Sequence, residues 1–215
     1  LSGYSEPRTW NKLVVAPIWM RDRFIHQIEM EREYALKGRK ARIVAKMNSL
    51  CDRDIIAALY AASAAGVKID LIVRGICCLK TGIPGISENI TVRSIVGNFL
   101  EHSRIFYFYS DGHEEIFMGS ADWMPRNLDK RVEIVFPVED EKLKEEVKHI
   151  LEMQLADNVK AHVLQPDGKY EKIDKRGKVL LSSQDYFCEE AWERAKLPES
   201  AVDNRVFIPA EAPED

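Results

Sequence analysis

One histidine in the sequence stands in a setting suited to phosphate chemistry. His102 lies in Asn98-Phe-Leu-Glu-His-Ser-Arg104, directly before a predicted strand, and the next predicted strand ends in Gly119-Ser-Ala-Asp122. An imidazole can transfer a proton or carry a phosphoryl group near neutral pH. We interpret Arg104 as a cation that balances phosphate charge, and Gly-Ser as a turn whose backbone N–H groups can approach phosphate oxygens. A solvated surface histidine without a role fits the composition equally well.

A second basic residue is expected at the same edge of the fold. Arg74 ends the buried strand 68–73, where the ligands of α/β proteins usually collect. A guanidinium can bind a phosphate through two parallel hydrogen bonds. An ion pair between loops is the alternative reading of Arg74. Lys46 and Asn48 close another predicted strand and are expected at this edge too.

A basic segment follows the Gly-Ser turn. Trp123-Met-Pro-Arg-Asn-Leu-Asp-Lys-Arg131 places Arg126, Lys130 and Arg131 around a tryptophan. This combination suits a polyanion or a nucleotide base, and a solvated charged turn remains the alternative. The sequence contains no P-loop, no Rossmann glycine set and no metal-ligand quartet.

The charge balance argues against general nucleic-acid binding. The 31 lysines and arginines face 35 aspartates and glutamates, for a net charge of −4. General nucleic-acid binding depends on a basic surface that neutralises phosphates. A local basic pocket is still compatible with this balance.

Hydrophobic periodicity predicts strands alternating with helices in the first half, and clustered strands thereafter. The expected strands are 12–16, 41–45, 68–73, 90–96, 105–109, 115–118, 132–138, one beside His162 and one around Tyr170, and the expected helices are 21–36, 52–65, 140–155 and 183–196. Asp111-Gly112 predicts a hairpin turn. Together these elements indicate an α/β fold, a mixed sheet flanked by helices.

We expect two parts: residues 1–165 as the main domain, and 166–215 as an extension with one strand, one helix and a mobile acidic end. The absence of an initiator methionine suggests a segment cut from a longer protein. No apolar stretch is long enough to span a bilayer, and the four cysteines lack disulfide or metal spacing. We therefore expect a cytoplasmic location, with peripheral attachment to the inner face of the membrane left open.

The paired pattern around His102 resembles the signature of the phospholipase D superfamily. Arg104 stands where lysine is usual, and Asp122 stands where asparagine is common. Enzymes of that superfamily use two such motifs, one from each of two similar half-domains. This chain has one motif, which implies half of an active site.

Six ordered segments resemble the carboxy-terminal catalytic domain of bacterial (type 1) polyphosphate kinase, a family with a phospholipase D-like fold. They are Ala45-Lys-Met-Asn-Ser-Leu50, Ile72-Val-Arg-Gly-Ile-Cys77, Pro84-Gly-Ile-Ser-Glu-Asn-Ile90, Val92-Arg-Ser-Ile-Val-Gly97, Leu100-Glu-His-Ser-Arg104 and Gly119-Ser-Ala-Asp-Trp-Met-Pro-Arg-Asn127.

The resemblance implies reversible transfer of the terminal phosphate of ATP to polyphosphate, through a phosphohistidine on a preceding domain. Arg74 and His102 match family positions that contact the nucleotide phosphates, and His102 would be the proton donor or phosphate stabiliser. Arg131 matches a further basic position near the phosphates. The resemblance implies magnesium with ligands on the preceding domain, and none from this chain. The implied partners are ATP or ADP, polyphosphate, the other domains of the polypeptide, and further copies in a homo-oligomer.

Two alternatives stay open. One is a phospholipase D-type phosphodiesterase or phosphatidyltransferase, in which a homodimer would bring two His102 residues together. The other is a non-catalytic assembly module. Hydrolysis of a phosphodiester that depends on His102 would favour the first, and the absence of ATP or polyphosphate binding would favour the second.

Overall fold

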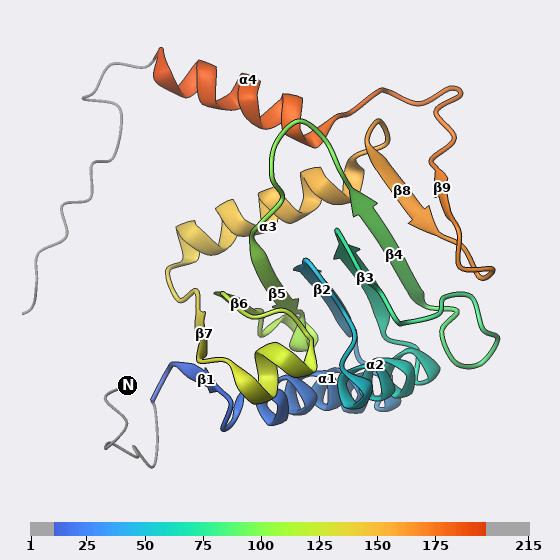
Figure 1. The fold of residues 1–215 in the computed structure, drawn as a ribbon, viewed down its shortest axis with the longest axis vertical. Helices are drawn as coiled ribbons and strands as arrows, with labels where there is room; N and C mark the ends of the chain where they lie inside the picture. Colours follow the sequence, from blue (N-terminus) through green and yellow to red (C-terminus); the bar gives the residue numbers. More distant parts are fainter. Residues whose placement is uncertain (1–10, 197–215) are drawn as a thin grey trace, which may run out of the picture.

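The computed structural model describes residues 11–196. Within this range one nine-stranded sheet has the order β1-β7-β6-β5-β2-β3-β4-β8-β9 (Figure 1). Its strands are β1 (Val14–Ala16), β2 (Arg42–Met47), β3 (Lys68–Val73), β4 (Ile90–Ile95), β5 (Arg104–Phe108), β6 (Glu115–Gly119), β7 (Glu133–Pro137), β8 (Ala161–Leu164) and β9 (Tyr170–Lys172). The helices are α1 (Met20–Leu36), α2 (Arg53–Ala64), α3 (Glu141–Ala156) and α4 (Ser183–Ala195), with short helical turns η1 (Ser110–Gly112) and η2 (Arg126–Lys130). The predicted mixed α/β sheet is confirmed, and η2 is an element that the periodicity did not predict.

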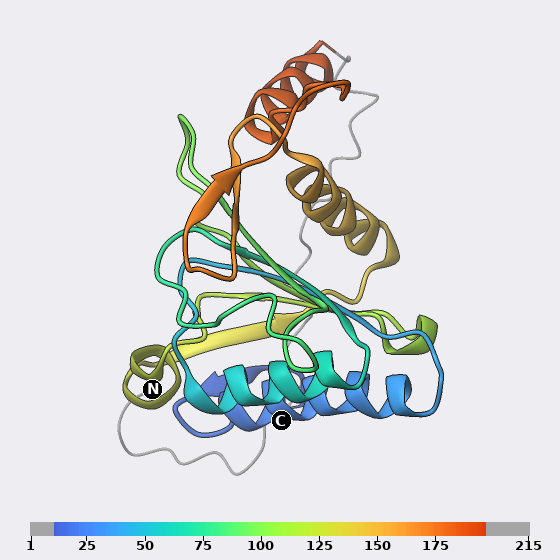
Figure 2. The same ribbon diagram turned by 90° about the vertical axis from the view of Figure 1, so that its right-hand side faces the viewer.

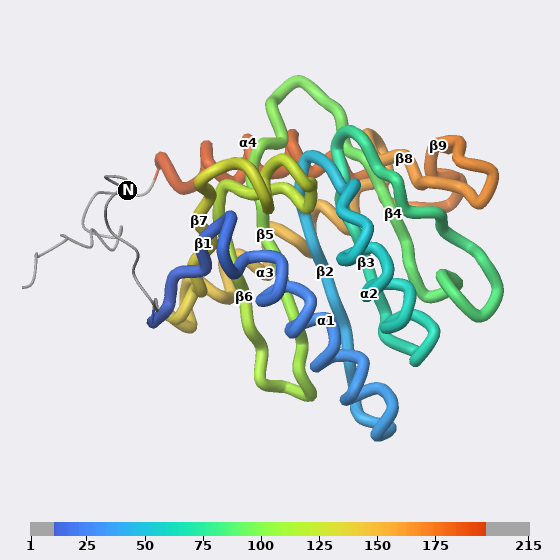
Figure 3. The backbone as a smooth tube through the Cα atoms, turned by 60° about the horizontal axis from the view of Figure 1, so that its bottom comes forward, coloured from blue at the N-terminus to red at the C-terminus, as the bar shows by residue number. Residues whose placement is uncertain are grey.

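The sheet is parallel at its centre and antiparallel at both sides. β2, β3 and β4 run parallel, while β5 pairs with β2 in the antiparallel sense. The carboxyl ends of β2, β3 and β4 therefore lie at the same edge as the start of β5. β6 is antiparallel to β5 and ends at this edge as well. We call it the carboxyl edge of the sheet (Figure 3).

Helices cover both faces of the sheet (Figure 2). α1 and α2 lie against one face, over a core that includes Phe24, Ile55 and Phe106. α3 lies on the other face, over a smaller core that includes Tyr107 and Leu151. Burial of apolar side chains on both faces explains why β2, β3 and β5 are almost continuously apolar.

The predicted extension contributes to the same sheet. β9 pairs with β8 in an antiparallel hairpin, and α4 follows it. The predicted strand and helix are thus present, whereas the division at residue 165 stays a prediction. The acidic end falls mainly on residues 197–215, which lie outside the described residues, as do residues 1–10. None of the helices within residues 11–196 combines the length and apolar character needed to cross a bilayer.

Candidate functional site

Arg74 and His102 lie at the same edge of the sheet. Arg74 directly follows β3, and His102 lies two residues before β5. The two strands flank β2, in which Met47 pairs with Val73 and Lys46 pairs with Ile105. Two strand spacings amount to about 10 Å. The fold therefore places Arg74 and His102 near strand ends at one edge, while their contact with one phosphate group stays a prediction.

The imidazole of His102 is exposed but held from one side. Nη1 of Arg104 lies 3.1 Å from Nδ1 of His102 and donates to the carbonyl oxygen of His102 at 2.6 Å. A guanidinium can only donate hydrogen bonds, so Nδ1 must act as the acceptor. The neutral ring then carries its proton on Nε2. This tautomer leaves an N–H group that can donate to a phosphate oxygen or give up its proton.

The side chain of Arg104 makes different contacts from those predicted. Its Nε and Nη2 atoms donate to the two carboxylate oxygens of Asp122 at 3.1 and 3.2 Å, and both residues are buried. Asp122 in turn accepts from the backbone N–H of Asn48 at 2.7 Å. The interpretation of Arg104 as a cation facing phosphate is wrong, because its donors are used by Asp122 and His102. Arg104 orients the imidazole instead.

Lys46 is a buried cation beside the histidine segment, with 1% of its surface exposed. Its Nζ atom contacts Oγ of Ser103 at 2.7 Å and a carboxylate oxygen of Glu101 at 3.1 Å. Burial is the main cause that lowers the pKa of Lys46. Glu101 opposes this effect, while Arg104 and Arg74 add to it. Lys46 thus binds both residues that flank His102.

Arg74 is half-buried and held through its backbone. Its N–H donates to the carbonyl oxygen of Met47 at 3.2 Å, and its carbonyl oxygen accepts from Oγ of Ser94 at 3.0 Å. Within residues 11–196 its guanidinium forms no hydrogen bond and no ion pair. In the alternative interpretation, Arg74 forms an ion pair between loops. Residues 11–196 contain no acidic partner for its guanidinium, so they give no support to this alternative.

The Gly-Ser turn is used within the fold. The N–H of Ser120 donates to the carbonyl oxygen of Ile134 at 3.1 Å, and its hydroxyl donates to Glu133. A Cβ atom on Gly119 would clash with the backbone of Ile134. The Gly-Ser pair therefore lets β7 approach β6 closely. The prediction that the Ser120 N–H is available to phosphate oxygens is wrong.

The basic segment after this turn divides into a buried and an exposed part. Trp123 is fully buried and packs on Phe24 and Phe106, with ring centroids 5.4 and 5.1 Å away, so it cannot stack on a nucleotide base. Arg131 is exposed, 3.9 Å from Glu133. Arg131 lies near the start of β7, four strands from β3, a distance of roughly 19 Å. Arg131 and Arg74 are therefore well separated along the carboxyl edge.

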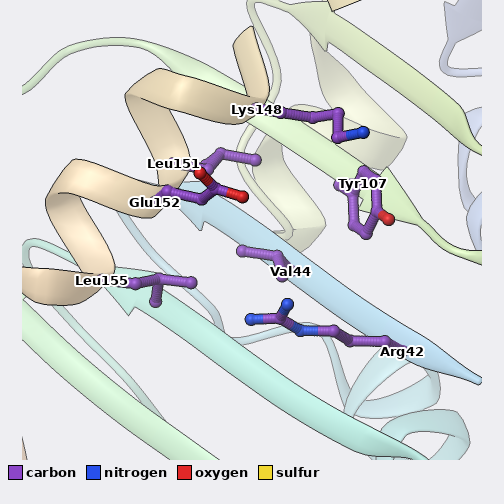
Figure 4. Close-up of a pocket in the computed structure, with 7 residues that line it drawn as sticks. All are labelled: Arg42, Val44, Tyr107, Lys148, Leu151, Glu152 and Leu155. Carbon is purple, nitrogen blue, oxygen red and sulfur yellow. The ribbon is translucent and has the colours of Figure 1, made fainter. Parts of the chain in front are cut away.

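A separate small hollow of about 40 Å³ lies under α3 (Figure 4). Arg42, at the start of β2, lines it together with Tyr107 and Lys148. The phenol of Tyr107 donates to Glu114 at 2.8 Å, and Lys148 also pairs with Glu114 at 2.8 Å. Arg42 lies at the opposite end of β2 from the carboxyl edge. This hollow is therefore distinct from the site around His102.

The sequence patterns did not identify three residues near His102, namely Glu101, Gln154 and Gln184. Glu101 accepts from Lys46, from Nε2 of Gln154 at 2.9 Å and from Nε2 of Gln184 at 2.8 Å. The only sequence signal for Glu101 was its position beside His102. The two glutamines lie 53 and 83 residues further along the chain, and no local pattern marks them.

The charges near His102 favour an anion. Lys46 and Arg104 are each paired with a carboxylate, Glu101 and Asp122 respectively, so Arg74 is the cation that remains unbalanced among the described residues. Among residues 11–196 no group of three or more histidines, cysteines or carboxylates has a geometry that could hold a metal ion. The described residues therefore suit phosphate binding and do not by themselves fit a magnesium site.

Comparison with known sequences points to one family. Residues 13–184 match the family described as polyphosphate kinase C-terminal domain 2. The chain is 60% identical over 170 residues to a polyphosphate kinase of Synechocystis. The matched segment covers 79% of this chain and 23% of that protein. The chain is 54% identical over 192 residues to the polyphosphate kinase of Prosthecochloris aestuarii. This matched segment covers 89% of this chain and 27% of the relative. The chain spans about a quarter of the length of these relatives.

Solved structures agree with this match. The polyphosphate kinase of Porphyromonas gingivalis superposes with a TM-score of 0.84 at 41% identity, covering 90% of this chain and 30% of that one. Nuc of Salmonella typhimurium, a phospholipase D family member, gives a TM-score of 0.52 at 17% identity over 72% of this chain and 97% of that one. The second likeness shows a shared phospholipase D-like fold only.

Proposed function

Because this chain belongs to the polyphosphate kinase C-terminal domain 2 family, we propose that it forms one wall of the active site of a polyphosphate kinase. The complete enzyme, in which this chain is joined to the preceding domain, reversibly transfers the terminal phosphate of ATP to inorganic polyphosphate. The observation that carries the proposal is the shared position of Arg74 and His102 at the carboxyl edge. Arg74 is a cation without a partner among the described residues, and His102 presents its Nε2–H group.

Phosphoryl transfer asks the protein mainly to position the reactants and to stabilise charge on the phosphate oxygens. In our proposal Arg74 binds oxygens of the nucleotide phosphates, and Nε2–H of His102 donates to an oxygen of the transferring group. The phosphoryl group passes from ATP to a histidine of the preceding domain, which releases ADP, and then to the end of polyphosphate. The Asp122–Arg104 pair holds the His102 tautomer that this role requires.

Magnesium belongs to the proposal as an expectation about the preceding domain. The carboxylates near His102 are already bound by cations and amide groups, so they offer no free ligand set. We propose that the magnesium ligands lie outside the described residues.

The partners in this proposal are ATP or ADP, polyphosphate, the remaining domains of the polypeptide and further copies in a homo-oligomer. Nucleic acid is not among them, in keeping with the net charge of −4. We also propose a cytoplasmic location. Support comes from the four cysteines, which are all free thiols and suit a reducing compartment.

The test is phosphate transfer by the complete enzyme carrying His102→Ala or Arg74→Ala. We expect each substitution to lower the rate by about 100-fold or more, because each removes a donor aimed at the transferring phosphate. His26→Ala and Arg176→Ala are matched controls at exposed positions and should retain full activity.

Near-wild-type rates in both site variants would contradict the proposal. Hydrolysis of a phosphodiester that depends on His102 would instead favour the phosphodiesterase alternative. A lack of any ATP or polyphosphate binding, unaffected by Arg74→Ala, would favour an assembly module.

A further inference from the structure

The segment that carries His102 has little apolar packing of its own. Between β4 and β5 the residues Val96, Phe99 and Leu100 are 66%, 59% and 69% exposed. A loop of this kind is not held by a hydrophobic core, so its conformation depends on polar contacts. Those contacts determine where the His102 imidazole lies.

Gln184, in the first turn of α4, supplies three of these contacts. Its Oε1 atom accepts from the N–H of Phe99 at 3.0 Å, and its Nε2 atom donates to the carbonyl oxygen of Phe99 at 2.8 Å. The side-chain amide thus pairs with a backbone amide as a neighbouring strand would. Nε2 also donates to Glu101 at 2.8 Å. Only 5% of Gln184 is exposed, so these bonds are sheltered from water.

Glu101 extends this contact to the sheet. One carboxylate oxygen accepts from Gln184, and the other accepts from Gln154 of α3 and lies 3.1 Å from the buried Nζ atom of Lys46. The residue immediately before His102 is therefore tied to α4, α3 and β2 at once. A buried charge that loses its partners is strongly destabilised, so this arrangement favours one conformation of the loop.

The position of Gln184 is itself fixed. The preceding Ser183 donates through its N–H and its hydroxyl to the buried carboxylate of Asp157, each at 2.8 Å. On the other side Gln184 packs so closely against Gly97 that a Cβ atom there would clash with it. The rest of α4 is mostly exposed, with Trp192 at 71%. The first turn of α4 is therefore buried, while Tyr186 and Phe187 further along the helix pack on His149 of α3.

We propose that Gln184 is a positioning residue for His102 and that α4 is thereby part of the phosphate site. Gln184 contacts no substrate in this proposal. It acts through Phe99 and Glu101, whose placement determines where the backbone of His102 lies, while Arg104 orients the ring. The inference rests on the proposed function, since it assumes that His102 serves the transfer step.

The first experiment measures kcat and KM for ATP in the complete enzyme with Gln184→Ala and Gln184→Glu. Displacing a positioned group by about 1 Å can lower a rate by about 100-fold, so we expect kcat to fall by 10- to 100-fold. KM for ATP should change by less than about threefold, because Arg74 is untouched. Gln184→Glu keeps the size of the side chain but sets a carboxylate against Glu101, so it should lower kcat at least as much. Gln165→Ala and Gln165→Glu, in the turn between β8 and β9, are matched controls that should keep the wild-type kcat.

The second experiment is a double-mutant cycle with His102→Ala. If Gln184 acts through His102, Gln184→Ala should cost no further activity once the imidazole is gone. Hydrogen exchange of segment 97–103 in the complete enzyme gives a readout independent of activity. The N–H of Phe99 should exchange at least tenfold faster in Gln184→Ala, and at an unchanged rate in Gln165→Ala.

The outcomes separate this inference from the proposed function. Wild-type kcat in both Gln184 variants, or unchanged exchange at Phe99, would overturn the positioning role while leaving the role of His102 intact. Equal losses from Gln184→Ala with and without His102 would also overturn it. Full activity of His102→Ala alone would instead remove the proposed function, and the inference with it.

Discussion

At the scale of single residues, His102 depends on a chain of contacts that begins at Asp122. The carboxylate of Asp122 binds the guanidinium of Arg104, which in turn binds Nδ1 of His102. Each contact is a hydrogen bond between specific atoms, and both members of the Arg104–Asp122 ion pair are buried. The chemistry of the exposed imidazole is therefore set by residues that no ligand would touch.

Asp122→Ala should lower the free energy of unfolding by about 3–5 kcal/mol, because it leaves the charge of Arg104 buried without a partner. Asp122→Asn keeps an acceptor for the N–H of Asn48 and should cost less. Denaturant unfolding of the variants measures both. Glu139→Ala removes an exposed ion pair with Lys12 and should cause no measurable change. An equal effect of Asp122→Ala and Glu139→Ala would contradict the structural role of the buried pair.

Gly119→Ala tests the close approach of β7 to β6. The added methyl group would clash with the backbone of Ile134, so we expect destabilisation of about 1–3 kcal/mol. Gly75→Ala is a milder control, because its Cβ would lie 3.1 Å from the nearest backbone atom. Thermal or denaturant unfolding compares the two. If Gly75→Ala proved the more damaging, the packing explanation for Gly119 would be wrong.

At the scale of elements, Asp157 is one of the residues that attach α4 to the rest of the fold. This carboxylate accepts from Ser183, from Lys160 and from Ala161. Burial raises the pKa of Asp157, but the hydrogen bonds from Ser183, Lys160 and Ala161 outweigh it and hold the pKa below its ordinary value. The ionised carboxylate thus stabilises the folded state.

This shift predicts how stability depends on pH. Because the pKa of Asp157 is lower in the folded state, its contribution is fully present above about pH 5 and is lost as pH falls below its ordinary value near 4. Asp157→Asn should therefore cost about 1–3 kcal/mol at pH 7 and progressively less toward pH 2. Unfolding free energies measured across this range test the prediction, with Asp167→Asn in an exposed turn as the control. A pH-independent cost of Asp157→Asn would contradict it.

The elements themselves were largely predictable from the sequence, whereas their polar contacts were not. Continuous apolar runs located β2, β3 and β5, because burial on both faces of the sheet imposes that pattern. The orientation of Trp123 was not predictable, since basic neighbours in the sequence say nothing about a side chain that points inward. Gln184 lies 85 residues from Phe99, its hydrogen-bond partner, so no local pattern could reveal it.

At the scale of the whole molecule, an acidic chain carries a cationic edge. The net charge is −4, yet cations outnumber carboxylates around His102. Arg131 lies at the same edge as Arg74 but several strands away. We infer that a long phosphate chain can contact both arginines, and that a nucleotide bound by Arg74 and His102 does not reach Arg131.

This separation predicts different effects of two arginine substitutions in the complete enzyme. Arg74→Ala should raise KM for both ATP and polyphosphate by about 10-fold or more, the size expected for a charge-assisted hydrogen bond. Arg131→Ala should raise KM for long-chain polyphosphate a few-fold and leave KM for ATP unchanged, because Arg131 is exposed and screened by solvent and by Glu133. An equal rise of KM for ATP in both variants would contradict the assignment.

The most direct measurement is a crystal structure of the complete enzyme with a non-hydrolysable ATP analogue. We predict phosphate oxygens within about 2.7–3.2 Å of both the Arg74 guanidinium and Nε2 of His102, in the same copy of the chain. Phosphates bound away from the carboxyl edge, or contacting only one of these two groups, would contradict the shared phosphate site.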